Sequence, residues 1–138
     1  MGLVRFGISL DKELLAPFDR LCKEKAYANR SEAIRDLIRD KLVRKEWGSA
    51  GGVVTGVISI VYDHHKRELV DTLMSVQHDH QDMIIASQHI HMDHDNCLEV
   101  IIVKGAADKA VELSSRLRSA KGVKHGEFVM TTTGKRLR

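Results

Sequence analysis

The stretch SQHIHMDHDNC, residues 87 to 97, places three histidines, two aspartates and a cysteine within eleven positions. Imidazole nitrogens and a cysteine thiolate are ligands that soft-to-borderline transition metals prefer in proteins. The stretch is therefore a candidate metal site, provided that the fold brings its side chains together.

The residues on either side of this stretch predict two antiparallel strands. DMIIASQHIHM and CLEVIIVKG flank a short polar turn around His94. Because side chains alternate along a strand, His89 and His91 point to one face. If the hairpin turns near His94, Cys97 lies opposite His91 and Glu99 opposite His89, on that same face. His89, His91 and Cys97 would then supply three metal ligands, with Glu99 placed to orient them from outside the ligand set.

A fourth ligand is expected from elsewhere in the molecule. The QHDH segment offers His78 and His80 at the end of a predicted helix, and spacing does not choose between them or among Ni(II), Cu(II) and Zn(II). A ligand from a neighbouring subunit would make metal binding a property of an oligomer. Five histidines are better explained as solvated surface residues than as weaker auxiliary metal sites: His64, His65, His80, His94 and His125.

The order of elements around the candidate site predicts a ferredoxin-like domain. A β-branched strand in VVTGVISIVYDH precedes a helix in HKRELVDTLMSVQHDH, and a helix in AADKAVELSSRLRSAKG and a strand in VKHGEFVMTT follow the hairpin. This β-α-β-β-α-β order places two helices on one face of a sheet. GSAGG is the predicted linker. We therefore expect an α+β chain that divides into residues 1–47, 48–52 and 53–138.

Charge and composition divide the chain at the same place. Residues 1–47 hold 11 Lys/Arg and 8 Asp/Glu, the remaining residues hold 11 of each, and all eight histidines lie beyond residue 63. This indicates a phosphate partner for the front part and a metal for the rear part. No apolar run is long enough to cross a membrane, and the glycines near residue 51 precede a strand, which argues against a nucleotide loop. With two cysteines, a cytoplasmic protein is expected.

The front part predicts one strand and two amphipathic helices. LVRFGISLD alternates, with Arg5, Gly7 and Ser9 opposite an apolar face. Asp11 offers an N-cap for the first helix, in which Pro17 predicts a kink or a late start. Asn29 or Ser31 caps the second helix. The apolar residues predicted to be buried are Val4, Phe6, Ile8 and Leu10 of the strand, Leu14, Leu15, Phe18, Leu21 and Cys22 of the first helix, and Ala33, Ile34, Leu37, Ile38 and Leu42 of the second.

A lone strand is unstable, so the front part is expected to pair its strand with that of a second copy around a two-fold axis. Such a two-stranded ribbon fits the DNA major groove and presents Arg5, Gly7 and Ser9 from both chains to base edges. The amino end of the second helix would bind phosphate through its backbone N–H groups. The candidate contacts there are Asn29, Arg30, Ser31 and Arg35.

VRFGISL followed by two helices entered through NRSEAIRDLIRD resembles a ribbon-helix-helix DNA-binding domain. Joined to a ferredoxin-like module with QHDH, HIH and CLE, essentially the whole chain resembles the nickel-responsive transcriptional regulators (the NikR family). The resemblance implies that His89, His91 and Cys97 of one subunit and His78 of another bind one Ni(II) per subunit in a plane. It also implies a homotetramer, a dimer of dimers joined through ACT-like rear modules.

The same resemblance implies three further features. Glu32 and Asp36 match acidic residues that help to hold a second cation, usually potassium, between the two domains. Lys66 and Arg67 match basic residues that touch phosphate. Gly7 departs from the pattern, because relatives commonly have a hydroxyl residue there, and a good base contact is worth about 1 to 3 kcal/mol. The operator sequence therefore stays open.

We expect a nickel-dependent repressor that binds a palindromic double-stranded DNA operator, of nickel-uptake genes by resemblance, with no enzymatic activity. One alternative keeps the fold but makes copper or zinc the signal. A metallo-hydrolase would use the same ligands with an open position for water, but no general base other than Glu99 is evident. An antitoxin-like protein that binds a protein partner would leave the metal ligands without a purpose.

Overall fold

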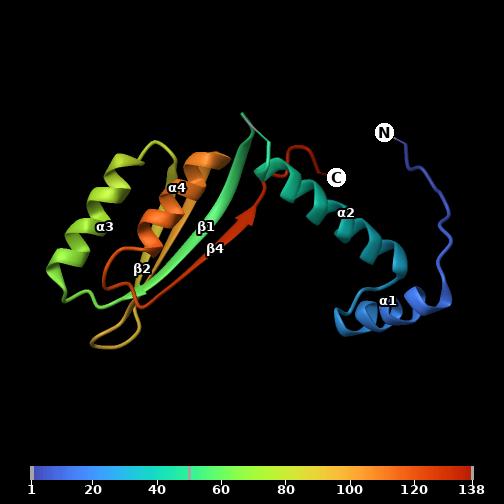
Figure 1. Cartoon of the computed structure of the whole chain (residues 1–138), viewed down its shortest axis with the longest axis horizontal. Coiled ribbons are helices and arrows are strands. Elements are labelled where there is room, and N and C mark those ends of the chain that lie inside the picture. The colour runs from blue at the N-terminus through green and yellow to red at the C-terminus, as the bar shows by residue number, and fades with distance from the viewer. Residues whose placement is uncertain (1, 50, 138) are drawn as a thin grey trace. The chain divides into compact units, whose positions relative to one another are not determined.

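The computed structural model describes residues 2–49 and 51–137 (Figure 1). Its helices and strands are α1 (Lys12–Glu24), α2 (Arg30–Trp47), β1 (Val53–Tyr62), α3 (Arg67–Asp79), β2 (Ile84–His91), β3 (Cys97–Ala106), α4 (Ala107–Arg118) and β4 (His125–Thr131). They form two compact units, Met1–Asp40 and Lys41–Arg138. Ala50, in the middle of the predicted linker, lies outside the described residues. Within the described chain, no helix combines the length and the apolarity needed to cross a membrane.

The first unit differs from the sequence prediction at its amino end. No strand is assigned among residues 2–11, because within one chain this segment has no neighbour to accept and donate its backbone hydrogen bonds. α1 begins directly after Asp11 and runs through Pro17, so the expected late start was wrong. Asp11 occupies the N-cap position without a side-chain hydrogen bond. Asn29 caps α2 as predicted, since its Oδ1 accepts the Glu32 N–H at 2.9 Å.

The first unit has almost no core of its own. Ala33 is the single buried hydrophobic residue among its described residues, while Val4 and Phe6 are 81% and 75% exposed. Several residues of this unit expected to be buried are in fact exposed: Ile8, Leu10, Leu14, Leu21, Leu37 and Ile38, as is Leu42 at the start of the second unit. Apolar surface contributes about 25 cal/mol per Å² when it is removed from water. An apolar face of this extent favours association with another surface.

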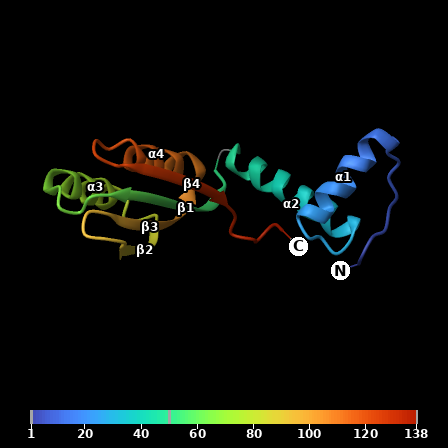
Figure 2. The same cartoon turned by 90° about the horizontal axis from the view of Figure 1, so that it is seen from below.

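The second unit is a four-stranded antiparallel sheet with the strand order β2-β3-β1-β4. α3 and α4 cover one face of this sheet (Figure 2), which is the β-α-β-β-α-β arrangement that the sequence predicted. Every second side chain is buried along β1 and along β3 as far as Val103, because these strands lie in the middle of the sheet and one face of each meets the helices. The core includes Val54, Ile58, Ile60, Leu73, Ile101, Val103, Leu113 and Leu117.

The carboxyl end of α2 is fixed to the sheet by an aromatic pair. Trp47 Nε1–H donates to the carbonyl oxygen of Thr131 at 2.8 Å. The Trp47 ring meets Phe128 edge-on, with a centroid distance of 5.4 Å and an interplanar angle of 84°. A β-carbon at Gly56 would lie 2.8 Å from Phe128 Cε1 and 3.3 Å from the Trp47 ring. Gly56 therefore leaves the room in β1 that this pair occupies.

We expect Gly56→Ala to lower the free energy of unfolding by about 1 to 3 kcal/mol, because the added methyl group overlaps a packed ring. Gly48→Ala is the matched control, since its β-carbon would meet backbone oxygens at 3.7 and 3.8 Å, which is ordinary contact. Its effect should stay within about 0.5 kcal/mol. Urea unfolding followed by the fluorescence of Trp47 measures both. Equal stabilities of the two variants would show that Phe128 moves aside without cost.

Candidate metal centre

The register of the β2–β3 hairpin brings the candidate ligands to one face of the sheet. His91 pairs with Cys97, and His89 pairs with Glu99, as the sequence predicted. Cys97 and Glu99 are buried, so this face is the one that α3 and α4 cover. A slip of one residue would turn the ligands of one strand to the opposite face. The register of this hairpin is therefore the feature that brings the candidate set to one face.

The turn that fixes this register is built on Asp93. Its carboxylate accepts hydrogen bonds from the Asp95 N–H at 2.9 Å and from Asn96 Nδ2 at 2.9 and 3.0 Å. The hydrogen bond from the Asn96 side chain has the largest effect, and together these bonds hold the pKa of Asp93 below its usual range. Asp93 therefore carries its charge at neutral pH and serves the turn.

Cys97 lies at the start of β3 with its side chain turned into the molecule. Its Sγ–H donates to the carbonyl oxygen of Tyr62 at 3.3 Å. Burial raises the pKa of the thiol above its ordinary value, and the nearby Glu99 carboxylate raises it further, against the opposing effect of the Tyr62 hydrogen bond. In the absence of a metal, the side chain is a protonated thiol at neutral pH.

Glu99 connects three elements around the candidate site. Tyr62 Oη–H donates to Oε1 at 2.6 Å, and Gln77 Nε2 donates to Oε2 at 2.6 Å. The Nδ1 atom of His89 lies 3.7 Å from Oε1. Burial and the bond to Glu99 together raise the pKa of Tyr62, so it stays a donor. The carboxylate is held from both sides and lies beside His89 without a hydrogen bond to it.

The structure distinguishes the two histidines of the QHDH segment. His78 is exposed and lines an open hollow of about 710 Å³ together with Gln77, His89 and Glu99. His80 is buried, and its Nδ1–H donates to the carbonyl oxygen of Val76 at 2.9 Å. The expectation that His80 is a solvated surface residue was therefore wrong, whereas His78 is open to solvent.

The predicted ligand set is not gathered within a single chain. Across the described residues, the groups whose ligand atoms lie within 4.8 Å of one another are Asp63–His64–His65 and His65–His94–Asp95. The rings of His89 and His91 lie 5.3 Å apart between centroids, and the Cys97 thiol faces Tyr62. The backbone register is in place, whereas the side chains are not in a coordinating arrangement.

The candidate DNA contacts of the first unit fall into two sets. Arg5, Gly7 and Ser9 are exposed and lie in the segment without regular structure. Arg30 forms a two-point pair with Asp19, with both N–O distances 2.9 Å. This pair lowers the pKa of Asp19 and raises that of Arg30.

The remaining candidates lie near the starts of α2 and α3. Arg35 pairs with Glu32, and Tyr27 Oη–H donates to Asp36, so both residues expected at a second cation already have partners. Ser31 is exposed on the first turn of α2. At the start of α3, Lys66 occupies the N-cap position and Arg67 is the first helical residue, and both are exposed.

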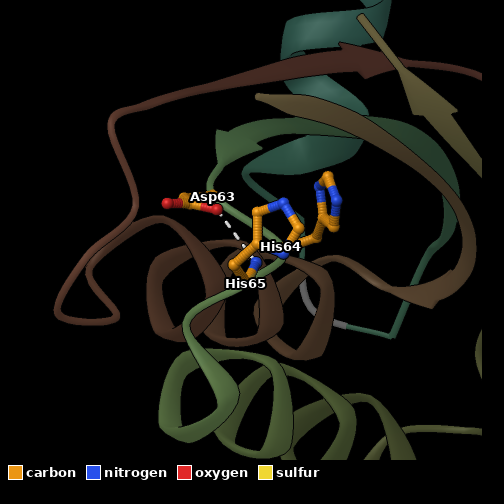
Figure 3. Close-up of side chains that lie close together, drawn as sticks. All are labelled: Asp63, His64 and His65. Carbon is orange, nitrogen blue, oxygen red and sulfur yellow. Dashed lines mark hydrogen bonds between the residues drawn. The ribbon is translucent and has the colours of Figure 1, made fainter. Parts of the chain in front are cut away.

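Sequence reasoning missed the partners of these groups. Tyr62 and Gln77 hold Glu99 from 37 and 22 residues away, and such contacts leave no periodic signal in a sequence. Asp63, His64 and His65 are adjacent in the sequence. If the strand continued through them, neighbouring side chains would point to opposite faces, so the sequence did not predict that they meet. The turn after β1 brings them together instead (Figure 3).

Comparison with known proteins assigns both units. Residues 4–45 match the family described as "Ribbon-helix-helix protein, copG family", and residues 55–131 match "NikR C terminal nickel binding domain". The fold and these matches define the class as a ribbon-helix-helix protein joined to a ferredoxin-like metal-binding domain. Within that class, the chain belongs to the family of nickel-responsive regulators.

Similar proteins cover nearly the full length of the chain. Proteins named "Putative nickel-responsive regulator" are 54% identical over 137 residues in Thermococcus onnurineus and 55% identical over 135 residues in Pyrococcus furiosus. Both matches cover 98 to 99% of each chain. Among solved structures, an uncharacterized protein of Thermotoga maritima, TM1266, aligns with a TM-score of 0.51 at 15% identity. It covers 56% of this chain and 96% of its own, and shares the fold alone.

Proposed function

We propose that this protein is a nickel-dependent transcriptional repressor that acts in the cytoplasm on a palindromic operator of nickel-uptake genes. The observation that carries the proposal is the hairpin register, which aligns His89, His91 and Cys97 on one face of a domain matched to a nickel-binding family. The ribbon-helix-helix match of residues 4–45 supports the DNA partner.

In this proposal His89, His91 and Cys97 of one subunit and His78 of another hold one nickel ion per subunit. Three imidazole nitrogens and one thiolate suit the square-planar preference of Ni(II), which Cu(II) shares. When bound, the ion supplies a doubly charged centre that favours the thiolate of Cys97 over the thiol. The exposure of His78 supports its role as the ligand contributed to a neighbouring subunit.

Glu99 favours a regulatory role over a hydrolytic one. A metallo-hydrolase needs a carboxylate that is free to take a proton from water. Each oxygen of Glu99 accepts a hydrogen bond of 2.6 Å, one from Tyr62 and one from Gln77. Both oxygens of Glu99 are therefore engaged within the protein, which argues against this carboxylate as the general base of a hydrolase.

The exposed apolar surface of the first unit supports the proposed assembly. Val4 and Phe6 lack cover within the chain, as do several apolar residues of the two helices: Leu14, Leu21, Leu37, Ile38 and Leu42. Pairing two amino-terminal strands would complete the ribbon and bury these residues. We propose that residues 1–47 form this DNA-binding dimer, that 48–52 link it, and that 53–138 join two dimers into a tetramer.

The proposed DNA contacts are Arg5, Gly7, Ser9, Asn29, Arg30, Ser31, Arg35, Lys66 and Arg67. We assign base edges to the first three and phosphates to the others. Glu32 and Asp36 are the proposed ligands of a potassium ion between the domains. Since Asp19 already pairs with Arg30, a phosphate at that arginine would share it with a carboxylate and contribute less than one at Lys66.

The proposed function is tested by selecting a preferred site from random double-stranded DNA in the presence of Ni(II). Its affinity is then titrated by fluorescence polarisation with Ni(II), Cu(II) and Zn(II) in turn. We expect Ni(II) to strengthen binding at the lowest free concentration. If Cu(II) or Zn(II) strengthened binding at a lower concentration, that metal and not nickel would be the signal. If no sequence were selected, the proposal of specific DNA binding would fail.

Nickel affinity should depend on pH through Cys97. Burial raises the pKa of this thiol, so at neutral pH each bound ion must displace its proton. The metal favours the deprotonated form, and affinity therefore rises with pH, by about tenfold per unit between pH ~7 and ~8. Competition titrations at several pH values measure this slope. A flat profile would mean that the thiol is not a ligand.

A further inference from the structure

A hollow in the second unit collects positive charge. It has a volume of about 360 Å³ and is lined by residues from the carboxyl end of α2, from β3 and from the segment that follows β4. Its basic lining residues are Lys104 of β3 and, in residues 132–137, Lys135 and Arg136. Among the described residues, Glu46 is the one carboxylate of the lining. Three cations and one carboxylate leave a net charge of +2.

Hydrogen bonds hold the segment that carries two of these cations. Thr132 Oγ1–H donates to Glu46 Oε2 at 2.9 Å, which ties the segment to the carboxyl end of α2 (Figure 1). Thr132 Oγ1 also accepts the Gly134 N–H at 3.1 Å, and the Leu137 N–H donates to the carbonyl oxygen of Gly134 at 3.2 Å. This last bond closes a turn whose two central residues are the two cations of the segment. The backbone that presents both cations is therefore held in place before any ligand binds.

The three cations share this hollow without partners of opposite charge. Within the described part of the chain, Lys104, Lys135 and Arg136 form no ion pair. Like charges gathered in one hollow repel one another, and an anion bound among them removes this repulsion. Thr133 adds a hydroxyl group to the same lining. Guanidinium, ammonium and hydroxyl groups are the donors with which proteins bind phosphate.

We propose that this hollow binds a phosphate group through Lys104, Lys135 and Arg136. The ligand is a phosphate-bearing anion, either the backbone of DNA or a free compound such as pyrophosphate, since both present the same charged oxygens. The volume of about 360 Å³ lies within the range of about 300 to 1,000 Å³ that small-ligand sites span. The inference goes beyond the proposed function, because it requires neither nickel nor a particular operator sequence.

The test compares two variants that lose the same charge. Lys135→Gln/Arg136→Gln removes two cations of the hollow, whereas Lys109→Gln/Lys121→Gln removes two exposed cations of the same unit that do not line it. Calorimetry measures the binding of pyrophosphate to the full-length protein without metal, because pyrophosphate itself binds metal ions. We expect the first variant to lose one equivalent per chain, or to bind it at least about tenfold more weakly, while the second keeps it. Circular dichroism checks that both are folded.

A second measurement identifies the source of the phosphate. Fluorescence polarisation follows the binding of a random-sequence DNA duplex at several salt concentrations. Each phosphate contact that is lost makes the dependence of log affinity on log salt shallower by about 0.9. A shallower dependence in Lys135→Gln/Arg136→Gln alone would assign the hollow to the DNA backbone. Loss of pyrophosphate binding with an unchanged salt dependence would assign it to a free phosphate compound.

Equal behaviour of the two double variants in both measurements would overturn the phosphate site. This outcome is distinct from failure of the proposed function, which is read from the selection of a DNA sequence in the presence of Ni(II). Neither double variant changes a proposed nickel ligand or a residue of the ribbon.

Discussion

Replacement of Cys97 by serine is expected to weaken Ni(II) binding by about 100-fold or more and to abolish the nickel-dependent gain in operator affinity. A hundredfold loss corresponds to about 2.7 kcal/mol of binding free energy. The loss follows from the ligand chemistry, because serine offers a neutral hydroxyl where cysteine offers a soft thiolate. Cys97 stands opposite His91 in the hairpin, and no other described cysteine lies in the second unit.

The substitution should leave the fold intact. The Cys97 thiol donates to the carbonyl oxygen of Tyr62, and a serine hydroxyl can make the same hydrogen bond. Any change in thiolate charge-transfer absorption, in calorimetric titration or in operator binding can then be assigned to the metal site, because the fold is unchanged. Cys22→Ser is the matched control, since it removes the other free thiol, half-buried in the first unit. If both variants bind nickel as the unmodified protein does, Cys97 is not a ligand and the nickel assignment fails.

The same comparison tests the coupling between metal and DNA. If nickel raises operator affinity by some factor, linkage requires that the operator raise nickel affinity by the same factor. Nickel titrations with and without the selected DNA should therefore differ in the unmodified protein and agree in Cys97→Ser. This outcome would show that the metal regulates DNA binding. An ion that binds equally well to the free and the DNA-bound protein would change neither the nickel affinity nor the operator affinity.

The hairpin shows how much of the candidate site the sequence can predict. The alternation of HIH and the short polar turn required a register in which His91 meets Cys97 and His89 meets Glu99, and the structure has that register. Period-two patterns specify which side chains share a face. They do not specify what lies above that face, so the donation of hydrogen bonds from Tyr62 and Gln77 to Glu99 was not predictable.

The first unit shows a different limit. Its two helices form as predicted, yet residues of the predicted apolar stripes such as Phe6 and Leu37 are exposed in the single chain. A hydrophobic pattern indicates that a face must be covered, but not whether the same chain or a second copy covers it. The strand that the alternation predicts is likewise not formed among residues 2–11 of the single chain, where no neighbouring strand supplies its hydrogen bonds. The proposed dimer would account for both differences.

The proposed ribbon leads to the second large effect, the loss of specific DNA binding in Arg5→Ala. When Val4 and Phe6 face the helices of the dimer, Arg5 must point to the opposite face, because adjacent strand residues alternate. A bidentate arginine–guanine contact is worth about 1 to 3 kcal/mol. Each ribbon carries Arg5 from two chains, so the loss should be about 2 to 6 kcal/mol per dimer, or at least about 30-fold in affinity.

Arg20→Ala separates this base contact from general charge. Arg20 lies exposed on α1, so its removal takes the same positive charge from the first unit without touching the ribbon. Fluorescence polarisation with saturating Ni(II) at several salt concentrations should show a small loss for Arg20→Ala, similar on selected and random DNA. Arg5→Ala should lose affinity for the selected sequence and approach the affinity for random DNA. Equal losses in the two variants would mean that Arg5 acts only through its charge, and the ribbon would then not be the surface that recognises sequence.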